Sequence, residues 1–174
     1  MKNVFCALLV AVVLCFGNNV FAFGDSKFEK EVKTEASAIK LLREVQRGGY
    51  DVISTKELHM TIEAGEDLLI IDTMPYEDSY KKNHIPGAKQ FLFPIPDMAE
   101  WDAEETEGKS IADYESLLGE DKNKKIIVYC GFVKCTRSHN GAMWASKLGY
   151  KNVYRHPGGI FAWKGAKFDV EEEQ

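Results

Sequence analysis

Two cysteines, Cys130 and Cys135, lie close together in the second half of the chain, and Arg137 follows them. The thiolate is the nucleophilic form of cysteine, and loop amides, a helix N-terminus or a nearby guanidinium lower the pKa of a thiol. An arginine also binds sulfur oxyanions through charge-assisted hydrogen bonds. Residues of these types at this spacing predict nucleophilic sulfur chemistry on a small anionic substrate.

The elements around this segment are predicted to hold the first cysteine at one edge of a sheet. Residues 125–129 are apolar and largely β-branched, which is typical of a buried strand. Residues 137–148 have the composition of a helix, and Gly149 ends it. Cys130 is therefore expected between a strand and a short loop that leads to a helix N-terminus. We expect the loop amides and the helix to lower the pKa of Cys130 and to favour its thiolate.

Strand and helix patterns alternate along the rest of the chain. The strand candidates are apolar throughout rather than alternating, which is typical of strands that are buried on both faces. The pattern predicts an α/β domain with a mostly parallel central sheet of about five strands, flanked by helices on both faces. The predicted strands are residues 50–53, 67–71, 89–93, 125–129 and 152–155, and the predicted helices are residues 27–46, 55–63, 76–82, 111–118, 137–148 and 160–164.

Polar or reactive side chains stand at the carboxyl ends of three predicted strands. These are Asp72, Cys130 and the pair Arg155 and His156. Ligands of open parallel sheets bind at this edge, so we expect these residues to line one site. Asp72 is expected to set the electrostatics of the pocket, to bind the arginine, or to cap a turn. Arg155 and His156 are candidates for the rim of the pocket or for the surface.

The first 22 residues have the pattern of a secretory signal peptide. Residues 1–2 give a positive start, residues 4–16 are apolar, and Val20-Phe21-Ala22 fits the small-x-small pattern before a cleavage site. We expect cleavage after Ala22 and export to the periplasm, without stable membrane insertion because the apolar run is short. The expected organisation is a signal peptide at residues 1–22, an N-terminal helical extension at 23–49, a domain at 50–168 and an acidic tail at 169–174.

The extension is predicted to be an amphipathic helix. Its apolar residues recur at helical spacing, and Gly48-Gly49 ends the pattern. The residues of this apolar stripe are Val32, Ala36, Ile39 and Leu42.

Removal of the signal peptide would leave two of the four cysteines in the mature chain. Cys6 and Cys15 would leave with the signal peptide, so the mature chain would keep Cys130 and Cys135. A disulfide between these two would close a very short loop, and its entropic stabilisation would be small. Redox or sulfur chemistry therefore explains the pair better than structural cross-linking does. Cys135 is expected to resolve a persulfide or sulfenate on Cys130, to carry sulfur itself, or to be a bystander.

Several classes of function are disfavoured. The chain of 174 residues has a formal net charge of -5 and no basic stripe, which argues against nucleic-acid binding. It has no glycine-rich dinucleotide motif and no P-loop, so we expect no organic cofactor. Its histidines and cysteines do not have metal-ligand spacing, so we expect no metal.

Four groups of residues resemble the signatures of the rhodanese superfamily of sulfurtransferases, over about residues 50–168. Each group alone is weakly specific, but the four in this order are highly specific. The resemblance implies a rhodanese-like fold in which Cys130 stands at the end of the catalytic strand. The groups are Leu69-Ile70-Ile71-Asp72 with Tyr76-Glu77-Asp78-Ser79-Tyr80, His84-Ile85-Pro86-Gly87-Ala88 after Asn83 in place of the usual glycine, Val128-Tyr129-Cys130 with Arg137-Ser138, and Leu148-Gly149-Tyr150-Lys151-Asn152-Val153-Tyr154 with Gly158-Gly159-Ile160-Phe161-Ala162-Trp163.

The loop after Cys130 departs from the family pattern. Six residues, 131–136, separate Cys130 from Arg137, whereas the family usually has four and the phosphatases that share the fold have five. The longer loop predicts a pocket that is wider than the thiosulfate cradle of the family or differently shaped. The candidate substrate-binding residues are Gly131, Phe132, Val133, Lys134, Thr136, Arg137 and Asp72.

The resemblance implies a sulfurtransferase. Cys130 would take a sulfane sulfur from thiosulfate, a polysulfide or a persulfide, and a thiol or cyanide acceptor would remove it. The alternative is a thiol–disulfide or chalcogen-oxyanion reductase or carrier that uses both Cys130 and Cys135. A third hypothesis is a binding module that docks a partner through the loop. The expected partners are a small sulfur-containing anion and a thiol acceptor or redox partner protein.

Overall fold

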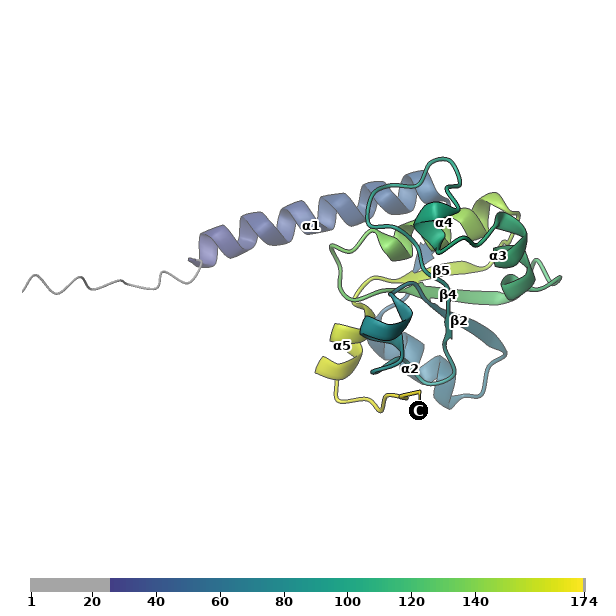
Figure 1. Cartoon of the computed structure of the whole chain (residues 1–174). Coiled ribbons are helices and arrows are strands. Elements are labelled where there is room, and N and C mark those ends of the chain that lie inside the picture. The colour runs from purple at the N-terminus through teal and green to yellow at the C-terminus, as the bar shows by residue number, and fades with distance from the viewer. Residues whose placement is uncertain (1–25, 174) are drawn as a thin grey trace, which may run out of the picture.

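Five parallel strands form the central sheet of the computed structural model, which describes residues 26–173 (Figure 1). Their order across the sheet is β1-β5-β4-β2-β3, so β4 lies in the middle. The predicted α/β fold with a parallel sheet of about five strands is confirmed, since every strand pairing is parallel. The strands are β1 (Asp51–Val52), β2 (Leu68–Asp72), β3 (Lys89–Gln90), β4 (Lys125–Tyr129) and β5 (Val153–His156).

Helices cover both faces of this sheet (Figure 1). Successive side chains of a strand point to opposite faces, so one strand serves two cores. In β4, Ile126 and Val128 belong to one buried cluster, and Ile127 and Tyr129 belong to the other. The first cluster lies under α1 (Lys27–Gly48), α3 (Ile111–Leu118) and α4 (Arg137–Lys147), and the second lies under α2 (Thr55–Glu63), the π-helical turn Tyr76–Tyr80 and α5 (Gly159–Gly165).

Serine caps fix where α1, α2 and α3 begin. Ser26, Ser54 and Ser110 each accept a hydrogen bond from the backbone amide three residues later, and the acidic side chain at that position accepts one from the serine amide. This reciprocal capping box satisfies two amides that the first turn of a helix leaves unpaired. The helices predicted at residues 55–63 and 111–118 have these bounds in the structure.

The strand predicted at residues 89–93 is shorter in the structure. Only Lys89 and Gln90 belong to the ladder, although the amide of Phe91 still donates to the Asp72 carbonyl. Pro94 has no amide proton, so the pairing cannot continue beyond it. A short 3-10 turn at Glu104–Thr106 interrupts the connection that follows.

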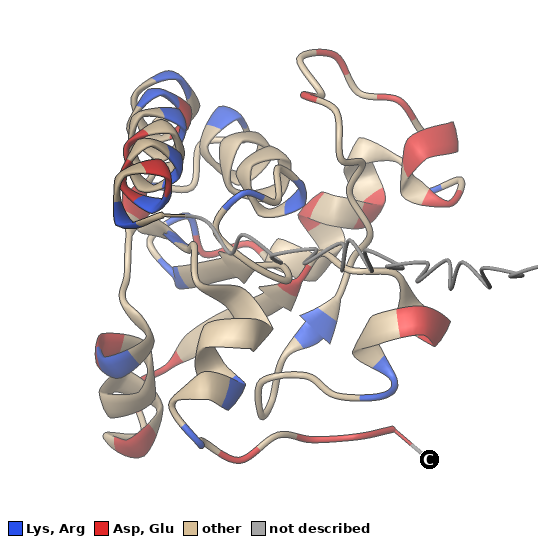
Figure 2. Cartoon of the chain, turned by 90° about the vertical axis from the view of Figure 1, so that its left-hand side faces the viewer, with Lys and Arg blue, Asp and Glu red and all other residues tan. Residues whose placement is uncertain are grey.

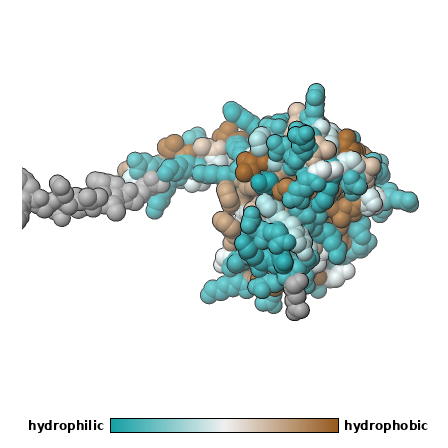
Figure 3. All heavy atoms as spheres, viewed as in Figure 1, coloured by the Kyte–Doolittle hydropathy of each residue, from teal (hydrophilic) through white to brown (hydrophobic). Residues whose placement is uncertain are grey.

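The N-terminal helix α1 projects from the domain, and apolar side chains lie exposed along it (Figures 1 and 3). The predicted apolar stripe does not pack, since Val32 is 64% exposed and Leu42 is 52% exposed. The buried residues of α1 are Glu44 and Gly48 instead. A side chain at position 48 would collide with the ring of Tyr50. The helix is therefore attached at its C-terminal end, by buried Glu44, by Val45 packed against the first core cluster, and by a close backbone approach at Gly48.

The predicted signal peptide, residues 1–22, lies outside the described residues, and so does Gln174. Between residues 26 and 173, no helix is both long and apolar enough to cross a membrane. The predicted acidic tail is joined to the domain at Glu171. Glu171 and His84 exchange two backbone hydrogen bonds of 2.9 and 3.0 Å. These bonds fasten the end of the chain beside the turn at residues 83–88.

Candidate active site

The segment from Cys130 to Thr136, called the cysteine loop below, connects β4 to α4 at the carboxyl edge of the sheet. Its start is fixed by α5. The amide of Ile160 donates to the Cys130 carbonyl at 3.0 Å, and the amide of Phe161 donates to the Gly131 carbonyl at 3.0 Å. A Cβ at Gly159 would lie 2.1 Å from the Cys130 carbonyl oxygen, so this approach requires glycine.

The two cysteines of the loop are free thiols, and both are buried. Cys130 is 0% exposed, whereas Cys135 is 9% exposed and lies nearer the surface. The Cys130 sulfur lies 3.1 Å from the Ser138 hydroxyl and 3.5 Å from the Cys135 carbonyl oxygen. The structure therefore brings the two predicted catalytic residues together, with Ser138 beside them.

The two thiols have opposite pKa shifts. Burial raises the pKa of Cys130 well above its ordinary value, and the neighbouring Cys135 raises it further. The hydrogen bond from Cys130, together with the amides of Arg137 and Gly131, lowers the pKa of Cys135 to about 6 in spite of its burial. The electrostatics of the pair therefore favour a thiolate on Cys135 over one on Cys130.

The predicted lowering of the Cys130 pKa is therefore wrong, because burial and Cys135 outweigh the amide and hydroxyl of Ser138, in the first turn of α4, which do lower this pKa. Cys130 lies beneath the loop, where its sulfur faces the carbonyl oxygens of Phe132 and Cys135. The amides of Gly131 and Arg137 reach the other sulfur.

Arg155 lies at the bottom of the site. It was predicted at the pocket rim or on the surface, but it is 0% exposed. Its Nε donates to the Ser138 hydroxyl at 2.9 Å, and its Nη2 donates to the carbonyls of Cys135 at 2.8 Å and Val133 at 3.3 Å. Its Nη1 donates to the Glu44 carboxylate at 2.5 Å. One buried guanidinium thus joins the cysteine loop, α4 and α1.

Sequence reasoning missed Glu44 and the role of Ser138. Glu44 had no distinguishing signal, because charges of both signs occur all along α1 (Figure 2). Ser138 had a signal, since it directly follows Arg137 in the resemblance to the family. His156, the other rim candidate, is buried, and its Nδ1 lies 3.3 Å from the Ile53 carbonyl oxygen.

The predicted substrate-binding residues of the loop divide into an outer and an inner group. Phe132 and Val133 are exposed, and the Phe132 ring contacts the Phe161 ring with centroids 5.5 Å apart. The Thr136 hydroxyl is buried, and it accepts a hydrogen bond from Lys40. The Arg137 guanidinium donates to the Phe93 carbonyl, so its charge acts on Cys135 without direct contact.

Asp72 is buried at the end of β2, where it caps a turn. It does not bind the arginine as predicted, because the guanidinium groups of Arg137 and Arg155 donate to other partners. Its Oδ1 accepts the amide of Met74 at 2.9 Å, which caps the turn after the strand. Burial raises the pKa of Asp72 to about 6, the Met74 amide and the Tyr129 hydroxyl oppose this, and the charge of Cys135 raises it. The carboxyl group therefore responds to the charge of the thiol pair.

An apolar groove of about 570 Å³ runs between α1 and the cysteine loop. The groove gives the loop an open side toward solvent. Its lining residues are Lys33, Thr34, Ser37, Ala38, Leu41, Phe132, Val133 and Lys134.

Solved structures of other proteins share this fold. The BH2092 protein from Bacillus halodurans has a TM-score of 0.53 at 21% identity, and the match covers 78% of this chain and 86% of that one. A thiosulfate sulfurtransferase from Pseudomonas aeruginosa has a TM-score of 0.53 at 22% identity, over 79% of this chain and 23% of that one. A polysulfide-sulfur transferase homodimer from Wolinella succinogenes has a TM-score of 0.53 at 14% identity, over 86% and 96%. At these identities the likeness establishes the fold alone.

A search of curated proteins gave no match. The model of the rhodanese-like domain family matches residues 54–166. This range contains β2 to β5, the cysteine loop and Arg155, but it leaves out α1 and Glu44. With the parallel sheet and the loop at its carboxyl edge, the match identifies the chain as a member of the rhodanese-like domain family.

Proposed function

We propose that this chain is a sulfurtransferase that moves a sulfane sulfur from thiosulfate, a polysulfide or a persulfide to a thiol or cyanide acceptor. The observation that carries the proposal is the Cys135 sulfur, whose pKa the Cys130 thiol and the amides of Arg137 and Gly131 lower to about 6. At neutral pH this sulfur is a thiolate beside a helix N-terminus, where an anionic donor is also attracted. Membership of the rhodanese-like domain family supports this class of reaction.

The first step is attack of the Cys135 thiolate on the outer sulfur of the donor. A bond forms between Cys135 and that sulfur, and the sulfur–sulfur bond of the donor breaks. The leaving group departs with the electron pair, as sulfite when the donor is thiosulfate. The amides of Gly131 and Arg137 stabilise the charge on the transferred sulfur. The product is a persulfide on Cys135.

The sulfur then passes to Cys130, the cysteine in the position of the family's catalytic residue. The Cys130 sulfur attacks the outer persulfide sulfur, the Cys135 thiolate leaves, and the proton of Cys130 moves to the transferred sulfur. A persulfide on Cys130 is shielded from water, because this side chain is fully buried. An acceptor thiolate or cyanide finally takes the outer sulfur, and Cys130 leaves as a thiolate and regains a proton.

A second candidate, a two-cysteine reductase or carrier, is favoured by the contact between the two thiols. If Cys130 attacks the inner sulfur of the Cys135 persulfide, a Cys130–Cys135 disulfide forms and hydrosulfide leaves. A dithiol reductant or a redox partner protein must then return two electrons before the next turnover.

Intact-mass spectrometry of the reduced protein, incubated with thiosulfate or, separately, with polysulfide at pH 7, tests the proposal. The wild-type protein should gain one sulfur atom and should lose it to cyanide with formation of thiocyanate. The Cys130→Ser protein should also gain sulfur, whereas Cys135→Ser should not, because it lacks the thiolate that meets the donor.

Other outcomes separate the candidates. A wild-type protein that loses two hydrogen atoms and keeps no sulfur supports the reductase. A Cys135→Ser protein that loads as fast as the wild type refutes the assignment of the first attack. If neither thiosulfate nor polysulfide changes the mass of the wild-type protein, sulfur transfer is refuted.

A further inference from the structure

The helix that precedes the family domain reaches into the candidate active site. The family match begins at residue 54, whereas α1 spans Lys27–Gly48. Most of α1 is exposed, yet the Glu44 side chain is 0% exposed. A carboxylate is almost never fully buried unless it is paired, and burial of this one requires a specific partner.

The partner of Glu44 is Arg155, and both side chains are 0% exposed. Glu44 Oε2 accepts from Arg155 Nη1 at 2.5 Å, and Nη1 also donates to the Tyr50 hydroxyl at 3.5 Å, while Nε and Nη2 donate to Ser138 and to the cysteine loop. Glu44 therefore binds one terminal nitrogen of the guanidinium, Nη1, while the other, Nη2, donates to the Cys135 and Val133 carbonyls. It touches neither cysteine itself.

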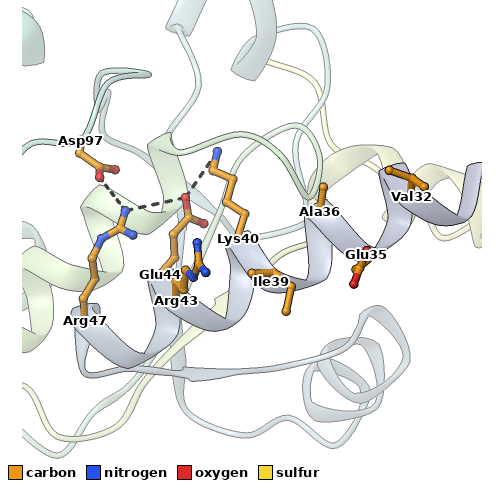
Figure 4. Close-up of a pocket in the computed structure, with 9 residues that line it drawn as sticks. All are labelled: Val32, Glu35, Ala36, Ile39, Lys40, Arg43, Glu44, Arg47 and Asp97. Atoms are coloured by element: carbon orange, nitrogen blue, oxygen red, sulfur yellow. Dashed lines mark hydrogen bonds and ion pairs between the residues drawn. The ribbon is translucent and has the colours of Figure 1, made fainter. Parts of the chain in front are cut away.

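A second contact from α1 reaches the same loop. Lys40 Nζ donates to the Lys134 carbonyl at 2.8 Å and to the Thr136 hydroxyl at 2.9 Å. Lys40 also lies 3.5 Å from Glu44 Oε1, and Arg47 lies 4.0 Å from the same oxygen. Figure 4 shows these three side chains gathered along one face of α1, with Asp97 beside Arg47. Lys40 of α1 thus binds the cysteine loop on both sides of Cys135, at Lys134 and at Thr136.

Stability alone is a poor reason for such an ion pair. Removing two charges from water is costly, and apolar replacements of a buried pair are often neutral or stabilising. The geometry of this pair is specific, because a planar guanidinium presents its donors in a fixed fork. A guanidinium that Glu44 holds in one orientation fixes the positions of the Val133 and Cys135 carbonyls. Because carbonyls and amides belong to the same backbone, this also fixes the direction of the loop amides.

We propose that Glu44 is a positioning residue of the cysteine site. Its carboxylate neutralises and orients Arg155, and Arg155 holds the carbonyls of Cys135 and Val133 and the hydroxyl of Ser138. The loop thereby keeps the conformation in which its amides reach the Cys135 sulfur. The inference rests on the proposed function only in treating the loop as the reaction site, and its test requires no sulfur donor.

Hydrogen exchange of the purified protein, followed by mass spectrometry at 25 °C, is the decisive measurement. The Cys135 amide donates to the Phe132 carbonyl at 3.0 Å, so its exchange reports the loop conformation. In Glu44→Gln the loop peptide should exchange about tenfold faster or more, while the β2 peptide keeps its wild-type rate. Glu35→Gln, an exposed carboxylate on the same helix, is the matched control and should change neither rate.

Alkylation of Cys135 gives a second readout that a purely structural role would not move. Loss of the loop amides should raise the pH at half-maximal alkylation of Cys135 from near 6 toward that of an ordinary thiol. The other charged or titratable groups that face the Glu44–Arg155 pair are Lys40, Arg47, Tyr50, His139 and Cys130, and all of them stay in place in Glu44→Gln.

The double variant Glu44→Leu/Arg155→Met covers the case in which Glu44→Gln does not fold. It removes both charges and leaves apolar side chains that suit a buried site. The folded double variant should again exchange faster in the loop than in β2. Wild-type loop exchange in a folded Glu44→Gln protein, or in the double variant when Glu44→Gln does not fold, would overturn the proposal.

Discussion

At the scale of single residues, the two cysteines differ because their sulfurs face different parts of one loop. The Cys130 sulfur lies 3.5 Å from the Cys135 carbonyl oxygen and 3.9 Å from the Phe132 carbonyl oxygen. Carbonyl oxygens repel a thiolate, whereas amides attract it. The Cys135 sulfur faces the amides of Gly131 and Arg137. These contacts favour the thiolate on Cys135 over one on Cys130, and in the proposed function Cys135 is the sulfur that meets the donor.

We expect alkylation of Cys135 by iodoacetamide to be half-maximal near pH 6 and to change little above pH 7. The rate follows the thiolate fraction, which rises tenfold per pH unit below the pKa and levels off above it. Peptide mass spectrometry across pH 4–10 gives the midpoint for each cysteine.

The control is Cys130→Ala, which removes the hydrogen bond that lowers the pKa of Cys135 most. In Cys130→Ala, the pH at half-maximal alkylation of Cys135 should be higher than in the wild type. A wild-type midpoint between pH 8 and 9, which is ordinary for cysteine, would contradict the charge assignment.

At the scale of elements, α5 and α4 approach the cysteine loop from its two ends. The α5 amides of Ile160 and Phe161 bind the first two loop carbonyls, and α4 begins directly after the loop at Arg137. Gly159 makes the first contact possible, because its φ of 57° lies in the left-handed region and its backbone lies against Cys130. The loop is thus built between two helix N-termini.

Gly159→Ala should destabilise the protein by about 2–4 kcal/mol. The left-handed region costs a residue with a Cβ roughly 1 kcal/mol or more, and overpacking adds about 1–3 kcal/mol. The added Cβ would lie 2.1 Å from the Cys130 carbonyl oxygen, which is backbone and cannot rotate away. Urea denaturation measures the change.

The matched control is Gly165→Ala in the last turn of the same helix, where no atom lies within 4 Å of the added Cβ. Its stability should stay within about 1 kcal/mol of the wild type, since alanine favours helix. Equal effects of the two substitutions would mean that the close approach at Gly159 is not restrictive.

At the scale of the whole molecule, buried ionisable groups give the fold two opposing pH dependences. Burial raises the pKa of Asp72 from 3.8 to about 6, so its contribution to stability is present below pH 4 and is lost as the pH rises through 6. Burial lowers the pKa of His139 from 6.5 to about 4, so its contribution is present above pH 6.5 and is lost as the pH falls through 4. In the wild type the two slopes oppose each other between pH 4 and 6, and burial also lowers the pKa of His156, which adds to the histidine slope.

Asp72→Asn removes the carboxyl group that opposes the histidine effect, so the stability of the variant should rise with pH as His139 predicts. Relative to the wild type, the variant should gain about 2–3 kcal/mol in the free energy of unfolding between pH 4 and pH 7, because a shift of one pKa unit is worth about 1.4 kcal/mol. Urea titrations of both proteins at several pH values measure this difference. A difference that is independent of pH would mean that Asp72 ionises as easily in the folded chain as in the unfolded one.

The sequence by itself determined the fold and the location of the site. The apolar run 125–129 and the helix pattern after Arg137 are local signals, and they placed Cys130 at the edge of a parallel sheet. The capping residues likewise act within one helical turn, so the bounds of α2 and α3 could be predicted. The two cysteines are near in sequence, so their contact required no knowledge of the fold.

Only the tertiary structure decided which thiol is charged and what holds the loop. The shift of the Cys135 pKa depends first on the hydrogen bond from Cys130 and then on the direction of the Arg137 and Gly131 amides, and backbone angles that residue types do not specify set both. The partner of Arg155 is Glu44, 111 positions earlier in the chain, on a helix whose many charges make one carboxylate indistinguishable from the rest. Burial distinguishes Glu44 from the other carboxylates of α1, because a carboxylate that is removed from water needs a charged partner, here Arg155.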